Sequence, residues 1–314
     1  MQNESRRALA PTAPRVPTPL IIVAGIALLI SLILAVPGDP EWWKVIVLGI
    51  VQGVTEWLPI SSTGHLLIVS KLLNYSGSLN GTFEIVIQIG TVLSVVAFYF
   101  SDLLAQARAV LGQGTPGEVQ SARRLWLAVI VAFVPAAGLG LLLKDFIQGV
   151  LFDSPAVIAG ALIVGGVIFL IIERLPPRAN LTGELGQIKL AQGLGVGLAQ
   201  LFALVPGMSR SGSSIVGGLL AGLDRRTATA FSFYLSIPIL SAATLAALVG
   251  SLDEIQPADW SRLALGAVVA MIVGYLTIGW LLRYIARNNF VLFGYYRIAV
   301  GLLILALVAG GVLV

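Results

Sequence analysis

Long apolar segments, separated by short polar connections, make up most of this chain. A helix needs roughly 20 predominantly apolar residues to cross the bilayer core, and seven stretches approach or exceed that length. The alternating segments expected of a membrane β-barrel are absent from the sequence. We therefore predict an all-α polytopic integral membrane protein, with spans at Leu20–Val36, Phe83–Phe100, Leu125–Leu143, Pro155–Ile172, Thr227–Val249, Leu263–Leu282 and Val291–Val314.

The composition agrees with a membrane protein. Hydrophobic residues make up 57% of the chain and charged residues 11%, against roughly 25% charged in an ordinary soluble domain. A net charge of +4 could indicate nucleic-acid binding, but the basic residues lie between apolar segments. We therefore expect them to be topology signals and expect no nucleic-acid partner. Since the chain has no cysteine, it has no disulfide, thiolate nucleophile or cysteine-ligated metal.

Two weaker apolar stretches, Val45–Leu73 and Ile188–Leu223, contain proline and glycine near their middle. We predict that each is a re-entrant hairpin, which enters and leaves the membrane on one side. With the N-terminus inside, this map places thirteen basic residues inside and four outside, as the positive-inside rule requires. The inside residues are Arg6, Arg7, Arg15, Arg108, Arg123, Arg124, Arg174, Arg178, Lys189, Arg225, Arg226, Arg283 and Arg287. The outside residues are Lys44, Lys71, Lys144 and Arg262, while Arg210 and Arg297 lie within apolar segments.

Residues 1–44 form a polar N-terminal segment followed by an extra first transmembrane helix. A cleaved signal peptide is the alternative, but no Ala-x-Ala site follows the apolar run, so we predict a retained helix. Residues 45–314 then form the catalytic membrane domain. Within it we predict a first repeat at about 45–143, a second at about 188–282, and a final helix at 291–314.

The two predicted hairpins resemble one another. An offset of 148 residues aligns Gln52 with Gln200 and Ser61 with Ser209. Because three predicted crossings separate the two copies, the second should be inverted relative to the first. Broken helices of inverted repeats meet near the membrane midplane and build a site there. We therefore expect a site where the two Ser/Gly-rich turns converge.

The first turn carries His65, the only histidine in the chain. Histidine can act as a nucleophile, a general base or a ligand near neutral pH. A lone histidine is often a satisfied core side chain. Here it follows a run of hydroxyl residues in a broken helix, and ionisable groups at membrane depth are functional candidates by default. We predict that His65 is catalytic.

Glu56 lies four residues after Gln52, which places both side chains on one face of a helix. This pair could orient His65, or it could hold a divalent cation such as Mg²⁺ or Ca²⁺ through oxygen ligands. A carboxylate that simply reaches the outer interface is the structural alternative for Glu56.

The second turn contributes Arg210, whose guanidinium matches phosphate oxygens. Gly207 and Gly212 flank it and would let backbone N–H groups approach an anion. A structural ion pair between helices is the alternative for Arg210. The hydroxyl residues are weaker candidates one by one, because small residues also serve helix packing. The hydroxyl candidates are Ser62, Ser209, Ser211 and Ser214.

The segments Gln52–His65 and Pro206–Gly212 resemble the two signature motifs of the bacitracin-resistance type of undecaprenyl-diphosphate phosphatase. The likeness extends over about residues 45–314. It implies hydrolysis of a polyprenyl (C55) diphosphate lipid to the monophosphate, at the outer face of the bacterial plasma membrane, with help from a divalent cation. It also implies recycling of the lipid carrier of cell-wall synthesis. The residues to which it assigns roles are Gln52, Glu56, Ser62, His65, Ser209 and Arg210.

Three departures from that family pattern are visible. Gln52 stands where many members carry Glu, which removes one negative charge from a metal site. Ser214 stands where Thr is usual, which keeps a hydroxyl. Residues 1–44 add a helix that shorter members lack.

We expect His65 to be the nucleophile, which would form a phosphohistidine, and Glu56 to orient its imidazole. The alternative is that His65 acts as the general base that activates Ser62 or water. Type 2 phosphatidic-acid phosphatases need two histidines, so a chain with one does not fit them. A secondary transporter or lipid-phosphate translocator is the rival of another class, because inverted repeats are transporter architecture. The second hairpin offers Arg210 but no carboxylate or histidine, which favours a one-sided catalytic site. The sequence leaves open whether the protein forms a homodimer.

Overall fold

The computed structural model describes residues 18–35, 37–75, 82–143, 146–151, 154–176 and 180–313. The polar N-terminal segment, Lys144 and Arg178 lie outside these ranges. Within them the chain is helical, with a single isolated bridge between Thr182 and Leu223 and no sheet strand. The all-α prediction is confirmed.

The elements follow one another along the chain with short connections. They are α1 (Thr18–Ala35), α2 (Trp42–Thr55), α3 (Ser62–Leu72), α4 (Thr82–Val86), α5 (Gln88–Phe98), α6 (Phe100–Val110), α7 (Pro116–Leu142), η2 (Ile147–Leu151), α9 (Pro155–Ile172), η3 (Leu185–Gln187), α10 (Leu190–Gln200), η4 (Leu201–Leu204), α11 (Arg210–Leu220), α12 (Arg225–Gly250), α13 (Pro257–Ile285) and α14 (Val291–Ala309).

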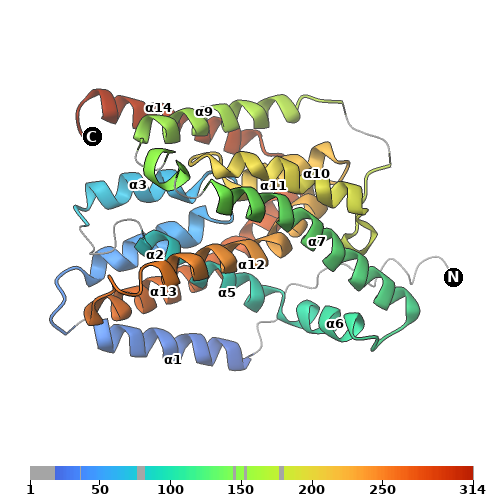
Figure 1. Cartoon of the computed structure of the whole chain (residues 1–314), viewed down its shortest axis with the longest axis horizontal. Coiled ribbons are helices and arrows are strands. Elements are labelled where there is room, and N and C mark those ends of the chain that lie inside the picture. Colours follow the sequence, from blue (N-terminus) through green and yellow to red (C-terminus); the bar gives the residue numbers. More distant parts are fainter. Residues whose placement is uncertain are drawn as a thin grey trace.

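The long helices run side by side across the molecule, as Figure 1 shows. α9 and α14 pack together along one edge, and α1 lies on α13 along the opposite edge. α13 also packs on α2 and α5, while α11 packs on α10 and α12. The connection from α1 to α2 and the end of α14 lie at the left of the view, whereas the α6–α7 connection lies at the right (Figure 1).

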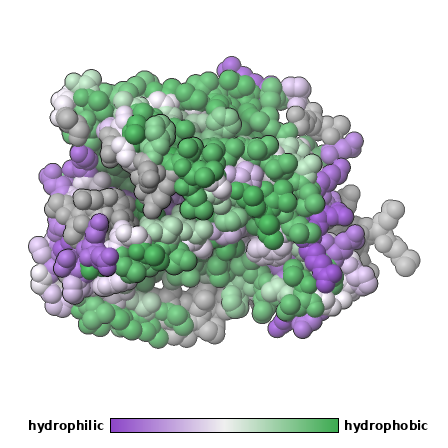
Figure 2. Space-filling model, in the orientation of Figure 1, coloured by the Kyte–Doolittle hydropathy of each residue, from purple (hydrophilic) through white to green (hydrophobic). Residues whose placement is uncertain are grey.

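The surface has the pattern of a protein that lies in a membrane. Hydrophobic residues cover the middle of the molecule, and hydrophilic residues gather towards its left and right ends (Figure 2). Among the described residues, five helices are long and apolar enough to cross a bilayer, namely α7, α9, α12, α14 and the Asp259–Ile285 part of α13. The helix α1, 18 residues long, covers most of the predicted first span Leu20–Val36. These are the features of a multi-pass membrane protein.

The predicted span Phe83–Phe100 is not one straight helix. The chain turns at Ile87 between α4 and α5, and it then bends by 75° into α6. We had not predicted α6, which carries Asp102 in its first turn and Arg108 in its last, where each charge complements the helix dipole. With this bent pair counted as one span, the number of candidate spans rises to six.

The helix α7 begins at Pro116, well before the predicted start at Leu125. Thr115 and Glu118 form a capping box there, with Pro116 in the first helical position. These are strong helix-start signals. The hydropathy pattern alone does not show them, because the first two turns of α7 are polar.

Both predicted hairpins are broken helices. α2 ends at Thr55 and α3 begins at Ser62, while α11 begins at Arg210 after the turn that follows η4. Ser61 has φ 71° and ψ 99°, and Ser209 has φ 72° and ψ 116°. A serine in this left-handed region costs about 1–3 kcal/mol, so tertiary contacts must hold both turns. The inverted relation of the two hairpins stays a prediction.

The helices α9 and α14 approach so closely that only glycine fits at several positions of their interface. A Cβ atom on Gly166 would lie 2.6 Å from the carbonyl oxygen of Gly294, and one on Gly301 would lie 2.8 Å from that of Ala159. Small residues allow such close contact between membrane helices. This contact fixes the position of α14 beside the two turns.

Candidate active site

The two turns meet, as the sequence predicts. Nη2 of Arg210 in the second hairpin lies 2.9 Å from Oε1 of Glu56 in the first. Close by, the hydroxyl of Ser211 donates to the main-chain oxygen of Leu58 at 3.1 Å. The side chains of Glu56 and Arg210 are only 5% and 11% exposed, so the ion pair is almost covered. Buried charges of opposite sign that pair in this way neutralise one another.

Glu56 accepts hydrogen bonds from two polar side chains of the first hairpin. Its Oε2 accepts hydrogen bonds from the hydroxyl of Ser62 at 2.8 Å and from Nε2 of Gln52 at 3.2 Å. The predicted spacing of Gln52 and Glu56 on one helical face is thus observed. Both oxygens of the carboxylate have donors, and three of the predicted site residues converge on it.

One nitrogen of the Arg210 guanidinium has no hydrogen-bond partner. Its Nη1 donates to the carbonyl oxygen of Ser232 at 3.1 Å, and its guanidinium lies 5.3 Å from the centre of the Trp57 ring. Its Nε is buried and has no hydrogen-bond partner. Unpaired buried donors are rare and call for an explanation; an anion that enters the site would supply the acceptor. Trp57 and Ser232 were not among the predicted site residues, although Trp57 directly follows Glu56 in the sequence.

Two helix N-termini begin at the meeting point. α3 starts at Ser62 and α11 at Arg210. The Oγ of Ser209 caps α11 by accepting from the backbone N–H of Gly212 at 3.1 Å, and it lies 3.1 Å from the hydroxyl of Ser211. Helix N-termini carry partial positive charge and favour bound phosphate. The site therefore combines a guanidinium with two positive helix ends.

Gly207 and Ser214 have mainly structural surroundings. Gly207 has φ +95°, and a Cβ atom there would lie 2.3 Å from the carbonyl oxygen of Ile158 in α9, so only glycine fits. The hydroxyl of Ser214 donates to Oε1 of Gln200 at 2.9 Å, within the second hairpin. These two predicted substrate contacts therefore lie beside the ion pair rather than in it.

His65 points to α14. Its Nδ1 lies 2.8 Å from the main-chain oxygen of Ser61, and its Nε2 lies 2.8 Å from the hydroxyl of Tyr296. In the described part of the chain, no hydrogen bond joins His65 to Glu56. We had expected Glu56 to orient His65, and the structure differs because Arg210, Ser62 and Gln52 already occupy the carboxylate.

A second arginine ties the two turns together. Arg297 of α14 is fully buried, and its guanidinium donates only to main-chain carbonyls. The acceptors are Pro59 in the first turn, Gly207 and Met208 in the second, and Ala161 and Leu162 of α9, at 3.0–3.3 Å. A charge inside an apolar segment was visible in the sequence, yet we had given Arg297 no role. It is the residue that joins both turns to α9.

The oxygen atoms of Gln52 and Glu56 are suitable ligands for a divalent cation. The Oε1 of Gln52 is buried without a hydrogen-bond partner, beside the carboxylate of Glu56. No cluster of three or more Asp, Glu, His or Cys side chains occurs among the described residues. A hard cation held by one carboxylate and one amide oxygen takes its other ligands from phosphate and water. Gln52 and Glu56 therefore supply two oxygen ligands that fit a hard cation such as Mg²⁺ or Ca²⁺, with the rest of its shell coming from other ligands.

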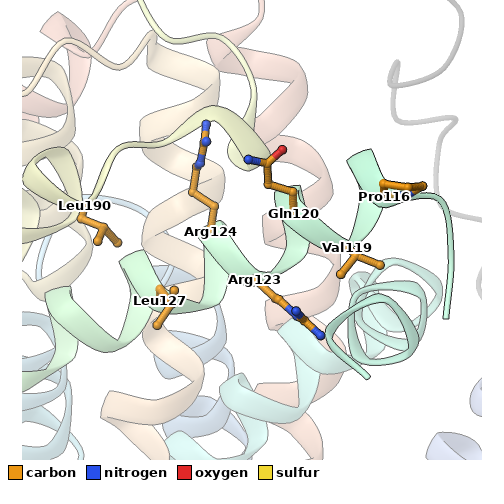
Figure 3. A pocket seen from close by; sticks show the side chains of 7 residues that line it. All are labelled: Pro116, Val119, Gln120, Arg123, Arg124, Leu127 and Leu190. Carbon is orange, nitrogen blue, oxygen red and sulfur yellow. The ribbon is translucent and has the colours of Figure 1, made fainter. Parts of the chain in front are cut away.

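A hollow of about 530 Å³ lies elsewhere, between the start of α7 and α10 (Figure 3). Arg123 and Arg124 project from α7 in different directions there, and Arg123 donates to the carbonyl oxygen of Val110. The hollow contains no carboxylate or histidine and none of the candidate residues. Its lining residues are Pro116, Val119, Gln120, Arg123, Arg124, Leu127 and Leu190.

The sequence of the chain is similar to a known protein family and to named bacterial proteins. Residues 45–303 match the family described as "Bacitracin resistance protein BacA". A protein of Deinococcus radiodurans named "Undecaprenyl-diphosphatase" is 44% identical over 276 residues, which cover 87% of this chain and 97% of the relative. A protein of the same name from Deinococcus deserti is 46% identical over 279 residues, 87% of this chain and 98% of the relative.

A protein from a third bacterium is similar to the same degree. "Undecaprenyl-diphosphatase 1" of Burkholderia lata is 46% identical over 268 residues, 83% of this chain and 94% of the relative. Both motifs on which the resemblance rested, Gln52–His65 and Pro206–Gly212, lie inside the matched region. The chain therefore belongs to the bacitracin resistance protein BacA family.

Proposed function

We propose that this protein is an undecaprenyl-diphosphatase, which hydrolyses undecaprenyl diphosphate to undecaprenyl phosphate and inorganic phosphate and so recycles the lipid carrier of cell-wall synthesis. The names of its relatives support this activity. The observation that carries it is the Glu56–Arg210 pair at the meeting point of the two turns. This pair places an anion-binding guanidinium beside the hydroxyl of Ser62.

Arg210 and the N-terminus of α11 bind the diphosphate. The free Nε of Arg210 supplies one donor at once, and exchange of Glu56 for a phosphate oxygen at Nη2 supplies a second. Phosphoryl transfer relies mainly on positioning and on stabilisation of charge. Glu56 thus holds Arg210 in place until the more highly charged ligand arrives.

His65 attacks the terminal phosphorus through Nε2, the nitrogen that does not contact the Ser61 carbonyl. The N–P bond forms while the bond from phosphorus to the bridging oxygen breaks, and undecaprenyl phosphate leaves. Water then hydrolyses the phosphohistidine, which releases inorganic phosphate and a proton. Ser62 is the alternative nucleophile, since its hydroxyl donates to a carboxylate that could accept its proton.

The two nucleophiles can be distinguished by trapping. The enzyme is quenched during turnover of substrate with a radiolabelled terminal phosphate, and peptides are mapped under conditions that preserve phosphohistidine. Acid-labile label located on His65 itself, within the peptide that also contains Ser62, and its loss in His65→Ala support the proposal. Label that stays on Ser62 in His65→Ala contradicts it.

Glu56 and the free Oε1 of Gln52 would hold a divalent cation, Mg²⁺ or Ca²⁺. When bound, such an ion supplies neutralisation of phosphate charge. Gln52 orients Glu56 through its Nε2, so the same side chain serves the ion and the carboxylate.

The site opens to the outside of the bacterial plasma membrane, and the N-terminus is cytoplasmic. The excess of basic residues in the predicted inner connections supports this orientation. The chain has no cysteine, so single cysteines report without background. Asp253→Cys in intact cells should react with an impermeant maleimide, whereas Arg287→Cys should react only after permeabilisation. The reverse pattern contradicts the orientation.

The activity itself is tested with purified protein in detergent and undecaprenyl diphosphate. We expect equal amounts of inorganic phosphate and undecaprenyl phosphate, identified by mass spectrometry. Folded protein that forms neither product with any divalent cation contradicts the proposal and favours a translocator.

A further inference from the structure

The hydrogen bonds of His65 assign its tautomer. A carbonyl oxygen only accepts, so the nitrogen at 2.8 Å from the Ser61 oxygen, Nδ1, carries the proton. In the neutral imidazole Nε2 then holds the lone pair, and it accepts from the hydroxyl of Tyr296 at 2.8 Å. Nε2 is the atom that either a nucleophile or a base would use. Its lone pair is therefore occupied by Tyr296.

Tyr296 contacts His65 in a second way. The two rings are parallel to within 1°, with centres 5.6 Å apart. Tyr296 is 42% exposed and lies on α14, inside a candidate span. In such apolar surroundings a tyrosine hydroxyl has little water to bind, so an internal partner is favoured.

Other groups near His65 do not compete for Nε2. Arg297 follows Tyr296 on α14, and its guanidinium binds main-chain carbonyls. α9 packs on α3 and has no titratable residue between Pro155 and Ile172. Glu56, at the end of α2, is held by Arg210. The hydrogen bond to Tyr296 is thus the only one that Nε2 makes among the described residues.

We propose that Tyr296 is a positioning residue for His65. Its hydroxyl fixes the plane of the imidazole and masks the lone pair of Nε2 until the diphosphate binds. This inference rests on the proposed function only for its effect on turnover. The masking itself is a property of the free protein.

Masking is tested with diethyl pyrocarbonate, which carbethoxylates an unprotonated and accessible ring nitrogen. His65 is the only histidine in the chain, so a full-length protein without a histidine tag reports on it alone. We expect Tyr296→Phe to be modified about fivefold faster than wild type at neutral pH, as loss of one hydrogen bond implies. Tyr295→Phe, the same change one residue earlier on a ring that is 57% exposed, should react at the wild-type rate. Equal rates in wild type and Tyr296→Phe would overturn the proposal.

Turnover tests the positioning role. Tyr296→Phe should lower kcat about tenfold with KM changed less than about twofold, because a misplaced reacting group costs rate rather than binding. An unchanged kcat in a variant that reacts faster with diethyl pyrocarbonate would also overturn the proposal. If wild type itself releases no phosphate, the proposed function fails, and the diethyl pyrocarbonate rates still decide whether Tyr296 masks His65.

Discussion

The carboxylate of Glu56 and the guanidinium of Arg210 lie 2.9 Å apart although 154 residues separate them in the chain. Each belongs to a different broken helix, and the ion pair joins the two. Because both side chains are almost covered, breaking the pair by removing one partner leaves a buried charge without compensation. We therefore expect the pair to stabilise the junction of the two turns and to hold Arg210 in place for an anion.

Arg210→Lys should lower kcat/KM about a hundredfold although the charge is kept. Lysine cannot present two aligned N–H groups to a phosphate, and it cannot replace the guanidinium that contacts both Glu56 and the Ser232 carbonyl. Steady-state phosphate release measures the effect. As a control, Arg283→Lys, on the exposed last turn of α13, should retain wild-type kinetics. If kcat/KM of Arg210→Lys stays within threefold of the wild-type value, positive charge alone is sufficient at this position.

Gln52→Glu should lower the divalent-cation concentration that gives half-maximal activity by about three- to tenfold. A carboxylate in place of the free amide oxygen adds negative charge beside Glu56, and affinity for hard cations rises with ligand charge. Metal titrations of phosphate release at saturating lipid measure it. Gln120→Glu, in the hollow of Figure 3, is the matched control. If Gln52→Glu leaves the cation concentration for half-maximal activity unchanged, Gln52 is not a ligand of the metal.

Gly165→Ala should displace Arg297. A Cβ atom at position 165 would lie 2.0 Å from Nη2 of Arg297, whereas one at Gly160 on the same helix would meet nothing within 4 Å. We expect Gly165→Ala to lower both the apparent melting temperature in detergent and kcat, the latter more than tenfold, because both turns lose their common anchor. Gly160→Ala should match wild type. Equal behaviour of the two alanine variants would contradict the anchoring role.

Arg297→Met should destabilise the fold by about 3 kcal/mol or more. The carbonyls of both turns would lose their donor in a buried site, and each unpaired group carries a desolvation cost. Unfolding of the detergent-solubilised protein measures the change. Arg283→Met, at an exposed position, should stay within about 0.5 kcal/mol of wild type. Wild-type stability of Arg297→Met would exclude this role.

Acid should weaken the contact between Asp39 and Arg262, which joins the α1–α2 connection to α13. Arg262 donates to both carboxylate oxygens of Asp39, at 2.6 and 2.9 Å, and these hydrogen bonds hold the pKa of Asp39 below its ordinary value of 3.8. A carboxyl with a lowered pKa stabilises the fold above its unfolded-state pKa, and this contribution disappears as the pH falls through the folded-state pKa.

Asp39→Asn should therefore be less stable than wild type at neutral pH, by about 0.5–1 kcal/mol. The difference should begin to shrink near pH 3.8, the ordinary pKa, and should vanish only below the lowered folded-state pKa of Asp39. Thermal unfolding at neutral pH and at a series of pH values below 3.8 measures the difference. Asp253→Asn, at an exposed position, controls for the loss of a negative charge. A difference that persists in acid would mean that the effect does not come from ionised Asp39.

Much of this site could be predicted from the sequence, because the patterns that indicate it lie within short segments of the chain. The repeated pattern around Ser61 and Ser209 predicted two broken helices, and both residues adopt the same unusual backbone conformation. The spacing of Gln52 and Glu56 predicted their contact. Each of these inferences depends on residues that are close together in the chain.

The roles of α14 could not be predicted in the same way. Arg297 was recognised as a charge in an apolar segment, but its acceptors lie in three other segments that only tertiary packing brings together. Tyr296 looks like an ordinary aromatic residue of a span. The direction of His65 depends on which side of α3 faces α14, and the hydropathy pattern does not specify this.

The most direct test of the account is phosphate release from undecaprenyl diphosphate by purified wild type, His65→Ala and Arg210→Ala, each with and without EDTA. A single site built from both turns should need His65, Arg210 and the divalent cation together. We therefore expect wild type to be active with Mg²⁺ or Ca²⁺, and we expect activity to be lost in each variant and on addition of EDTA. Folded Arg210→Ala or His65→Ala that turns over like wild type would contradict the claim that the two turns form one catalytic site.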